Sequence, residues 1–293
     1  MSTQTSRLLV TEPRVWFITG CSTGFGRELA KQAIEHGYRT VVTARDVTTL
    51  EGYAAAENAL VLQLDVTKPD QVAAAVAATQ ERFGWIDVLV NNAGIGYFAA
   101  VEESEEAEVR KMFEVNVFGT SRMIHAVLPG MRQRRKGTIV NFSSIGGLRS
   151  FPAVGYYNAT KFAVEGLSEA LWQEVEPLGI KVVVVEPSGF RTDWAGRSAN
   201  ESPRQIDDYV ATAGAARARL RAISGKQEGD PVRAARAVIE AVESDSPPHH
   251  LLLGNAAFDG AMAKLDELRK DFSDGEAVAR GADFPKTPLG LAA

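Results

Sequence analysis

Cysteine is almost absent from the 293-residue chain, in which Cys21 stands alone. A single thiol excludes an internal disulfide and agrees with a reducing compartment, so we expect a cytoplasmic protein. Long apolar runs are absent too, because no window approaches the roughly 18 uninterrupted apolar residues of a membrane span. Residues 1–13 are polar and lack the apolar core of a signal peptide. We therefore expect no membrane insertion, no secretion and a flexible leader at residues 1–13.

A long run of one charge is also missing. The 32 basic and 37 acidic residues give a net charge of −5 and are interspersed along the chain. This distribution excludes the electrostatic footprint of a protein that binds nucleic acid or an anionic membrane. The 45% hydrophobic and 24% charged residues are ordinary for a globular protein. We expect a small-molecule partner and no nucleic acid.

Short apolar segments alternate with helical patterns along the chain. The predicted strands are residues 14–19, 40–44, 60–64, 86–90, 138–142, 181–185 and 249–253. Helical patterns are predicted through residues 29–34, 69–83, 104–131, 157–175, 231–242 and 256–272. The continuous β-branched run at 181–185 is typical of a strand buried on both faces of a parallel sheet. This order predicts one α/β domain over residues 14–273, and a Gly- and Ala-rich tail, 274–293, that is expected to be poorly ordered.

A glycine-rich loop follows the first predicted strand and opens the first helical pattern. Its candidate binding residues are Gly20, Ser22, Thr23, Gly24, Phe25 and Gly26. Glycines let a backbone turn tightly and approach a pyrophosphate, whose charge is favoured by the free N–H groups at a helix start. The loop therefore predicts dinucleotide binding, with a plain tight turn as the alternative.

The end of the second predicted strand has no acid at the position where NAD-binding folds usually read the adenosine ribose. Ala44 stands there, and Arg45 follows. A guanidinium can hold a 2′-phosphate through two hydrogen bonds, which favours NADP(H) and leaves NAD(H) possible. The alternative is that Arg45 is a solvated residue beside Asp46.

Polar and small residues also follow the third and fourth predicted strands. Asp65 could accept a hydrogen bond from an adenine amino group or could tie down the turn before the next helix. The fourth strand ends in Asn91, Asn92, Ala93 and Gly94. Small residues allow a flat ligand to approach, whereas the asparagine amides could instead brace neighbouring strands. Both readings stay open.

Tyr157 and Lys161 lie four residues apart in a helical pattern and therefore on one face. An ammonium beside a phenol favours the phenolate and is expected to lower its pKa, as a general acid/base requires. Ser144 follows the predicted strand 138–142, at the edge of a parallel sheet where ligands bind. Asn116 lies inside a helical pattern, where its amide needs a partner such as a buried water. A solvated Tyr–Lys pair is the alternative.

Residues 193–229, here called the lid segment, combine polar and Ala/Arg-rich stretches with Trp194. We expect a lid over the substrate, and the alternative is a decorative surface insertion. His249 and His250 follow two prolines and have no evident metal partner in the sequence, so a surface turn is expected there and no metal site.

Taken together, these motifs resemble the short-chain dehydrogenase/reductase family over residues 14–255. The glycine loop reads T-G-x-x-x-G-x-G, the active-site motif reads Y-x-x-x-K, and the loop and Ala44–Arg45 are similar to NADP-using hydroxysteroid and retinol dehydrogenase-like members. The resemblance implies a single-domain Rossmann fold, with helices on both faces of a doubly wound, mostly parallel seven-stranded sheet. Ser188 departs from the usual glycine, and Phe25 and Phe190 stand where smaller aliphatic residues are common.

The resemblance also implies roles for individual residues in hydride transfer between a nicotinamide cofactor and an alcohol or carbonyl. Tyr157 would exchange the proton, Lys161 would lower its pKa and bind the nicotinamide ribose, Ser144 would bind the reacting oxygen, and Asn116 would hold a relay water. Cofactor contacts are implied for the glycine loop, Arg45, Tyr157, Lys161 and for Asp65, Val66, Asn92, Ala93, Gly94, Pro187, Gly189, Phe190 and Thr192. A homodimer or homotetramer is implied, paired through helices at about 105–134 and 157–175.

The expected substrate is a hydrophobic alcohol, ketone or aldehyde. Most side chains predicted near the nicotinamide are apolar or aromatic: Tyr97, Phe98, Ile145, Leu148, Phe151, Tyr156 and Trp194. Arg149 and Arg191 are the nearest candidates for binding an anion. Two other functions stay open, namely a catalytically idle NADP(H)-sensing Rossmann protein and a sugar-nucleotide epimerase or dehydratase. The epimerase motif T-G-x-x-G-x-x-G does not match this loop.

Overall fold

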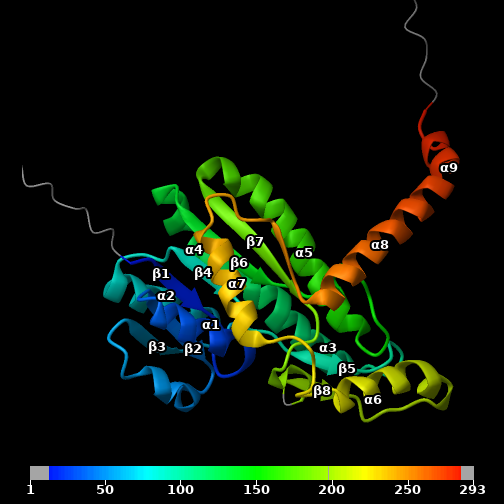
Figure 1. Cartoon of the computed structure of the whole chain (residues 1–293), viewed down its shortest axis with the longest axis horizontal. Helices are drawn as coiled ribbons and strands as arrows, with labels where there is room; N and C mark the ends of the chain where they lie inside the picture. The colour runs from blue at the N-terminus through cyan, green and yellow to red at the C-terminus, as the bar shows by residue number, and fades with distance from the viewer. Residues whose placement is uncertain (1–12, 197, 285–293) are drawn as a thin grey trace, which may run out of the picture.

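The computed structural model describes residues 13–196 and 198–284, and Figure 1 shows the chain as a central sheet flanked by helices. All seven strands of the sheet are parallel, in the order β3-β2-β1-β4-β6-β7-β9. Their bounds are β1 Val15–Ile18, β2 Arg39–Ala44, β3 Ala59–Gln63, β4 Val88–Asn91, β6 Gly137–Phe142, β7 Ile180–Pro187 and β9 His250–Leu253. The order reverses between β1 and β4, and that reversal opens a ligand crevice at the carboxyl edge of such sheets.

Helices cover both faces of the sheet because the strands are apolar on both sides. Alternate residues of β1 belong to different cores: Trp16 and Ile18 pack with α1 (Gly24–Glu35) and α7 (Pro231–Glu243). Phe17 packs on the opposite face with α2 (Pro69–Phe83), α4 (Thr120–Arg134) and α5 (Gly155–Val175). The fold is therefore the single-domain, doubly wound Rossmann architecture that the alternation of strands and helices predicts.

The helical pattern at residues 104–131 is not one α-helix. It consists of α3 (Glu106–Phe113), a π-helical segment (Glu114–Gly119) and α4. The expectation of one uninterrupted helix is thus wrong in its middle, where the turn widens around Asn116. Single π-helical turns inside α-helices are frequent at functional sites.

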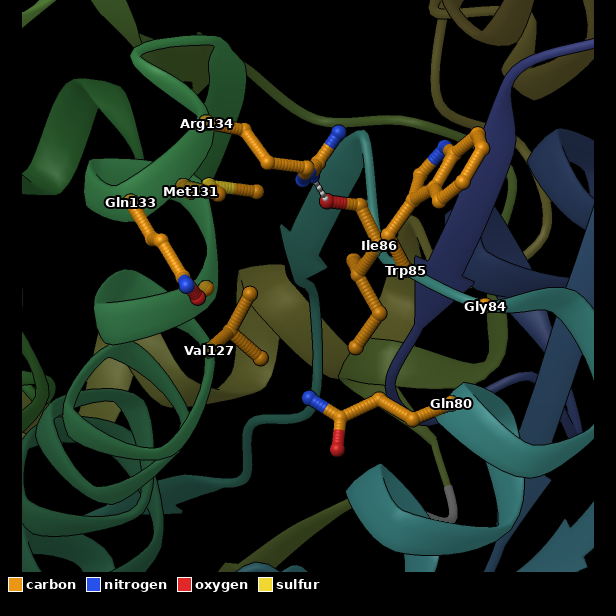
Figure 2. A pocket seen from close by; sticks show the side chains of 9 residues that line it. Gln80, Gly84, Trp85, Ile86, Val127, Met131, Gln133 and Arg134 are labelled. Atoms are coloured by element: carbon orange, nitrogen blue, oxygen red, sulfur yellow. Dashed lines mark hydrogen bonds between the residues drawn. The ribbon is translucent and has the colours of Figure 1, made fainter.

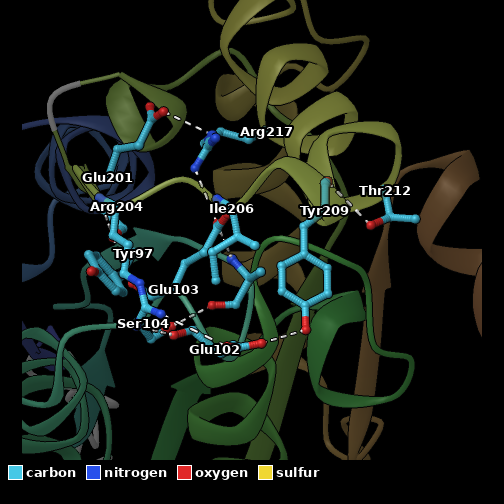
Figure 3. Close-up of polar contacts among 12 residues, drawn as sticks. Tyr97, Glu102, Glu103, Ser104, Glu201, Arg204, Ile206, Tyr209, Thr212 and Arg217 are labelled. Carbon is cyan, nitrogen blue, oxygen red and sulfur yellow. Dashed lines mark hydrogen bonds and ion pairs between the residues drawn. The ribbon is translucent and has the colours of Figure 1, made fainter.

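The lid segment, as far as the structure describes it, is folded and contacts the rest of the domain. Its strand β8 (Ala199–Glu201) pairs in parallel with β5 (Gly96–Phe98), and α6 (Ala215–Ala222) follows. Buried Glu103 accepts hydrogen bonds from the backbone N–H groups of Ile206, at 2.8 Å, and Ala100, at 3.0 Å. Arg217 forms ion pairs with this carboxylate, at 3.6 Å, and with the carboxylate of Glu201, at 3.0 Å (Figure 3).

The remaining elements are short turns and a C-terminal arm. The 3₁₀ turns are Val47–Tyr53, Ile145–Gly147, Glu176–Leu178, Asp193–Ala195 and Asp207–Tyr209, and Val210–Gly214 is a second π-helical segment. The arm, α8 (Asn255–Asp274) and α9 (Glu276–Gly281), extends away from the sheet (Figure 1). Part of the expected poorly ordered tail is thus helical, and its end, 285–293, lies outside the described residues, as does most of the expected leader. Among the described helices, none is long and apolar enough to cross a membrane.

Candidate active site

The glycine loop after β1 can be built only with glycine at three positions. Gly20 and Gly24 have φ of +72° and +59°, in the left-handed region that side chains with a Cβ disfavour. A Cβ added to Gly26 would lie 2.4 Å from both the side-chain nitrogen of Asn92 and the carbonyl oxygen of Gly20. One added at Gly20 would lie 2.9 Å from the Cα of Ala93. The loop therefore packs closely against the residues that follow β4.

Helix α1 begins in this loop with its positive end free of acids. Its first turn contains no acidic residue, and the N-cap residue Thr23 makes no side-chain capping bond to any described residue. Free N–H groups and the dipole of a 12-residue helix favour an anion at this end. Glycines, which leave the backbone of the loop accessible, and an uncapped helix start together fit the pyrophosphate of a dinucleotide.

The two phenylalanines that depart from the family pattern contact each other. The rings of Phe25 and Phe190 lie 5.0 Å apart, and Phe25 also lies 5.5 Å from Phe142 at the end of β6. These rings join the glycine loop to the segment after Pro187. In that segment the hydroxyl of Thr192 accepts a hydrogen bond from the N–H of Trp194, at 3.4 Å. A Cβ added to Gly24 would lie 3.3 Å from the Cβ of Thr192, so this threonine faces the glycine loop, and Gly189 precedes it in the same connection.

The ends of β2 and β3 present Arg45 and Asp65. Arg45 is exposed directly after β2. The carboxylate of Asp65 accepts hydrogen bonds from the N–H, at 2.9 Å, and the hydroxyl, at 2.8 Å, of Thr67. The turn-stabilising interpretation of Asp65 is thus confirmed. The side chain of Val66 is buried and packs in the core with α2 and α4.

The asparagines after β4 brace neighbouring backbone. The amide of Asn92 donates to the carbonyl oxygens of Thr19, at 2.9 Å, and Gly20, at 3.0 Å, and Asn91 donates to Asn141, at 2.9 Å. The bracing interpretation is therefore confirmed. A Cβ added to Gly94 would lie 3.8 Å from the ammonium of Lys161, which places the end of β4 between the glycine loop and the catalytic candidates.

Tyr157, Lys161 and Ser144 come together at the carboxyl edge. Tyr157 and Lys161 lie one turn apart near the start of α5, with the ammonium 5.6 Å from the phenol ring centre. That ammonium is buried and donates to the carbonyl oxygen of Phe142, at 2.7 Å. The hydroxyl of Ser144, just after β6, hydrogen-bonds to the phenol. It also accepts from the N–H of Gly146, at 3.0 Å, which fixes its position.

Burial has the largest effect on the pKa values of Tyr157 and Lys161. It raises the pKa of Tyr157 to about 12, although the bond from Ser144 works in the opposite direction. The expected lowering of the Tyr157 pKa by Lys161 is thus not found. Burial also lowers the pKa of Lys161 to about 8, and the charge of Glu165 partly opposes this change. At neutral pH the phenol is therefore protonated and the ammonium is largely charged.

Asn116 has direct protein partners in the π-helical segment. Its carbonyl oxygen accepts from the N–H of Ile95, at 2.8 Å, and its amide donates to the carbonyl oxygen of Ile95, at 2.9 Å, and to the hydroxyl of Thr160, at 3.1 Å. These bonds give the buried amide direct partners within the chain. Asn116 holds the segment after β4 against α5.

The lid segment reaches the catalytic candidates through one side chain. The indole of Trp194 lies 4.8 Å from the ring of Tyr157 and 5.5 Å from that of Phe98. Of the other predicted pocket residues, Tyr97, Phe98 and Ile145 are buried in small cores, Leu148 and Tyr156 are half-buried, and Phe151 is 41% exposed. Arg191 donates to the carbonyl oxygen of Gln227, at 2.7 Å, within the lid segment.

A separate hollow lies at the opposite edge of the sheet. Figure 2 shows it between α2 and α4, lined by Gln80, Trp85, Val127 and Arg134. Trp85 precedes β4, so this hollow opens at the amino edge of the parallel sheet. It contains none of the predicted site residues and is no part of the active site.

Threonines that the sequence did not single out support the site. The hydroxyl of Thr19 accepts from the N–H groups of Asn92 and Ala93, each at 3.0 Å, and Thr160 contacts Asn116. Both belong to the motifs, at the position before Gly20 and the position before Lys161. Their partners follow from the pairing of β1 with β4 and from the contact of α5 with the π-helical segment, which a single sequence does not show.

Two relatives are similar in sequence over two thirds of this chain or more. A fungal protein of Botryotinia fuckeliana, named oxidoreductase BOA17, is 39% identical over 258 residues, which cover 87% of this chain and 94% of that protein. The 3-ketodihydrosphingosine reductase of Bacteroides thetaiotaomicron is 42% identical over 200 residues, which cover 68% of this chain and 72% of that enzyme.

Solved structures are similar to this chain as well. A short-chain dehydrogenase from Streptomyces avermitilis superposes with a TM-score of 0.88 at 40% identity and covers 93% of this chain and 99% of its own. A Burkholderia phymatum enzyme in complex with NAD gives 0.74 at 28% identity, covering 96% and 99%. An alcohol dehydrogenase from Thermococcus sibiricus, complexed with 5-hydroxy-NADP, gives 0.68 at 28% identity, covering 83% and 96%.

The sequence profile of the short chain dehydrogenase family matches residues 14–203, well over half of the chain. With the Rossmann sheet, the glycine loop and the Tyr157–Lys161 pair on one edge, the match leads to one assignment. The protein is an oxidoreductase of the short-chain dehydrogenase/reductase family.

Proposed function

We propose that this enzyme transfers a hydride between NADP(H) and the carbonyl or secondary alcohol of a hydrophobic small molecule, with Tyr157 as general acid/base. The observation that carries the proposal is the convergence of Tyr157, Ser144 and Lys161 at the carboxyl edge, beside the glycine loop. A nicotinamide dinucleotide, when bound, supplies or accepts the hydride. The protein's residues hold, orient and move the proton.

The dinucleotide is proposed to lie along the edge from β3 to β7. Free N–H groups at the start of α1 would bind its pyrophosphate, and exposed Arg45 would bind a 2′-phosphate, which favours NADP(H) over NAD(H). The proposed contacts are Gly20, Ser22, Thr23, Gly24, Phe25, Gly26, Arg45, Asp65, Val66, Asn92, Ala93, Gly94, Tyr157, Lys161, Pro187, Gly189, Phe190 and Thr192. The asparagine and aspartate in this set also keep their bracing roles.

The protonation states favour Tyr157 as the proton donor in reduction. With its pKa raised to about 12, the phenol carries its proton throughout the neutral range. The Ser144 hydroxyl, held by the N–H of Gly146, would bind the substrate oxygen and the phenol together. The charged ammonium of Lys161 would stabilise the phenolate left after proton transfer, and Asn116 would keep the adjoining backbone in place.

The substrate is proposed to be apolar because the lid segment presents Trp194 over Tyr157. Aromatic and apolar walls bind hydrophobic groups at about 25 cal/mol per Å² of apolar surface buried. The cation candidate Arg191 already bonds to backbone in the lid segment, which leaves it poorly placed to bind a carboxylate. A bulky ketone or secondary alcohol fits this setting better than a small keto acid.

NADPH oxidation with ketones of increasing alkyl or aryl bulk tests this proposal, with small keto acids as the comparison. We expect kcat/KM to favour the apolar ketones. Tyr157→Phe should lower kcat by about 10²- to 10⁴-fold while NADPH binding, followed by fluorescence, stays nearly unchanged. Tyr156→Phe is the matched control, since Tyr156 has no lysine one turn away. Turnover of Tyr157→Phe close to that of Tyr156→Phe would refute the role of Tyr157.

A further inference from the structure

Three potential metal ligands meet outside the catalytic group. Glu165 lies on α5 one turn after Lys161, Glu186 is the penultimate residue of β7, and His250 opens β9. One ligand atom from each of the three lies within 4.8 Å of the others. The two acids that could share an ion with His250 come from elements far away in the chain, which is why the sequence did not point to them.

The two carboxylates are buried without adequate compensation. Glu186 is fully buried; one of its oxygens lies 2.5 Å from Nδ1 of His250, and the other has no hydrogen-bond partner among the described residues. The Glu165 side chain is 12% exposed, and the hydroxyl of Ser143 and the carboxyl of Glu186 face it, but neither of its oxygens has a hydrogen bond of standard geometry among the described residues. Buried charged oxygens without partners are costly, so this cluster requires a proton or a cation.

The lysine one turn before Glu165 does not fill this need. Lys161 is electrostatically coupled to Glu165, but its ammonium donates to the carbonyl oxygen of Phe142, at 2.7 Å. The charge of the two carboxylates is therefore left to the imidazole of His250 or to a bound cation.

The donor set and its surroundings suit a transition-metal ion. Imidazole nitrogen and carboxylate oxygen are ligands of Zn²⁺, with bonds of about 2.0–2.2 Å. In a tetrahedral site such ligands lie about 3.4 Å apart, a value between the 2.5 Å from His250 to Glu186 and the 4.0 Å from His250 to Glu165. His250 is 51% exposed, so its side opens a path for entry and a fourth position for water.

We propose that Glu165, Glu186 and His250 bind one divalent transition-metal ion of the Zn²⁺ class. The ion would be structural, because the three ligands join helix α5 to β7 and to β9, the strand at one edge of the sheet. An edge strand of four residues has hydrogen bonds to one neighbour only, here β7. A metal bond to its first residue would fasten that edge.

The untagged full chain, stripped with EDTA and titrated with ZnCl₂ by calorimetry at neutral pH, tests the site. We expect one ion per chain, a higher melting temperature with Zn²⁺, and weaker binding as the pH falls and the ligands are protonated. Glu186→Gln and His250→Ala should each weaken Zn²⁺ binding at least tenfold. His250→Ala changes a half-exposed side chain, so it reports on the site even if Glu186→Gln folds poorly.

Two neighbouring residues provide matched controls. His249→Ala removes the adjacent histidine, whose ring stacks on Trp172 at 4.3 Å, and Glu169→Gln removes an exposed acid one turn beyond Glu165. Both variants should bind Zn²⁺ like the unaltered protein. No Zn²⁺ binding by the unaltered protein would overturn the proposal, as would an affinity that Glu186→Gln and His250→Ala leave unchanged.

Discussion

Glu103 holds the lid segment, and its replacement by glutamine should loosen that segment selectively. The carboxylate is 3% exposed and lies 3.6 Å from Arg217 (Figure 3). It accepts one hydrogen bond from the N–H of Ala100, before Glu103, and one from the N–H of Ile206, in the lid segment. Glutamine keeps one acceptor oxygen but turns an NH₂ group toward the other N–H donor. That donor is then buried without a partner.

The magnitude follows from the bonds lost. A hydrogen bond to a charged group contributes about 1.5–3 kcal/mol, and an unsatisfied buried donor costs about 1–3 kcal/mol. Breaking a buried ion pair costs about 3–5 kcal/mol when the partner is stranded, but Arg217 keeps its bond to Glu201 at 3.0 Å. We therefore expect Glu103→Gln to lower the stability of the lid-segment contact by about 2–3 kcal/mol. This is close to the sum of the lower limits for the lost hydrogen bond and the unsatisfied donor.

Hydrogen exchange of the backbone amides in residues 199–222 is the appropriate assay, because the loss is local. A cost of about 2–3 kcal/mol corresponds to exchange about 30- to 150-fold faster. Glu102→Gln is the control: its side chain is 59% exposed, so its bond to Tyr209 should contribute less than about 1 kcal/mol. Equal exchange rates in the two variants would refute the reasoning.

The pH dependence of the same contact has a definite sign. Burial raises the pKa of Glu103, but the backbone bonds from Ile206 and Ala100 and the charge of Arg217 outweigh it, so the pKa lies below its ordinary value of 4.5. A lowered carboxyl pKa stabilises the fold above the unfolded value, and this contribution is lost as pH falls below about 4.5. Protection factors in the lid segment, in which the intrinsic pH dependence of amide exchange is divided out, should fall over that acidic range in the unaltered protein and less so in Glu103→Gln.

Three further predictions concern the cofactor, the catalytic ammonium and assembly. Ala44→Asp with Arg45→Ala should shift the ratio of kcat/KM values from NADPH toward NADH, and a higher kcat/KM with NADH in the unaltered protein would refute the role of Arg45. Since the pKa of Lys161 is lowered to about 8, kcat/KM for reduction should be constant near pH 7 and fall above about pH 8 as the ammonium deprotonates; a profile rising through that range would contradict its role. Light scattering should show a dimer or tetramer, because Phe118 and Phe162 expose 52% and 44% of their surfaces on the helices expected to pair, whereas a 31.6 kDa particle would exclude this.

The fold and the placement of Tyr157 and Lys161 on one helix face could be predicted because they depend on short-range patterns. Apolar runs gave the strands of the sheet, and Tyr157 and Lys161 needed only helical spacing to share a face. The pKa of Tyr157 could not be predicted, because it depends on burial by residues such as Trp194 from the lid segment. The Glu186–His250 contact was missed for a similar reason: the register of β7 and β9 brings the two residues together.

The aromatic contact between α1 and the segment after β7 limits which substitutions can occur one at a time. Phe190 packs on Phe25, and a Cβ added to Gly229 would lie 2.4 Å from the Phe190 ring. Exchanging either phenylalanine alone for a smaller aliphatic residue would leave a cavity beside the glycine loop, and a large ring at 190 requires a bare backbone at 229. Positions 25, 190 and 229 should therefore change together among relatives, with a side chain at 229 appearing only where residue 190 is small.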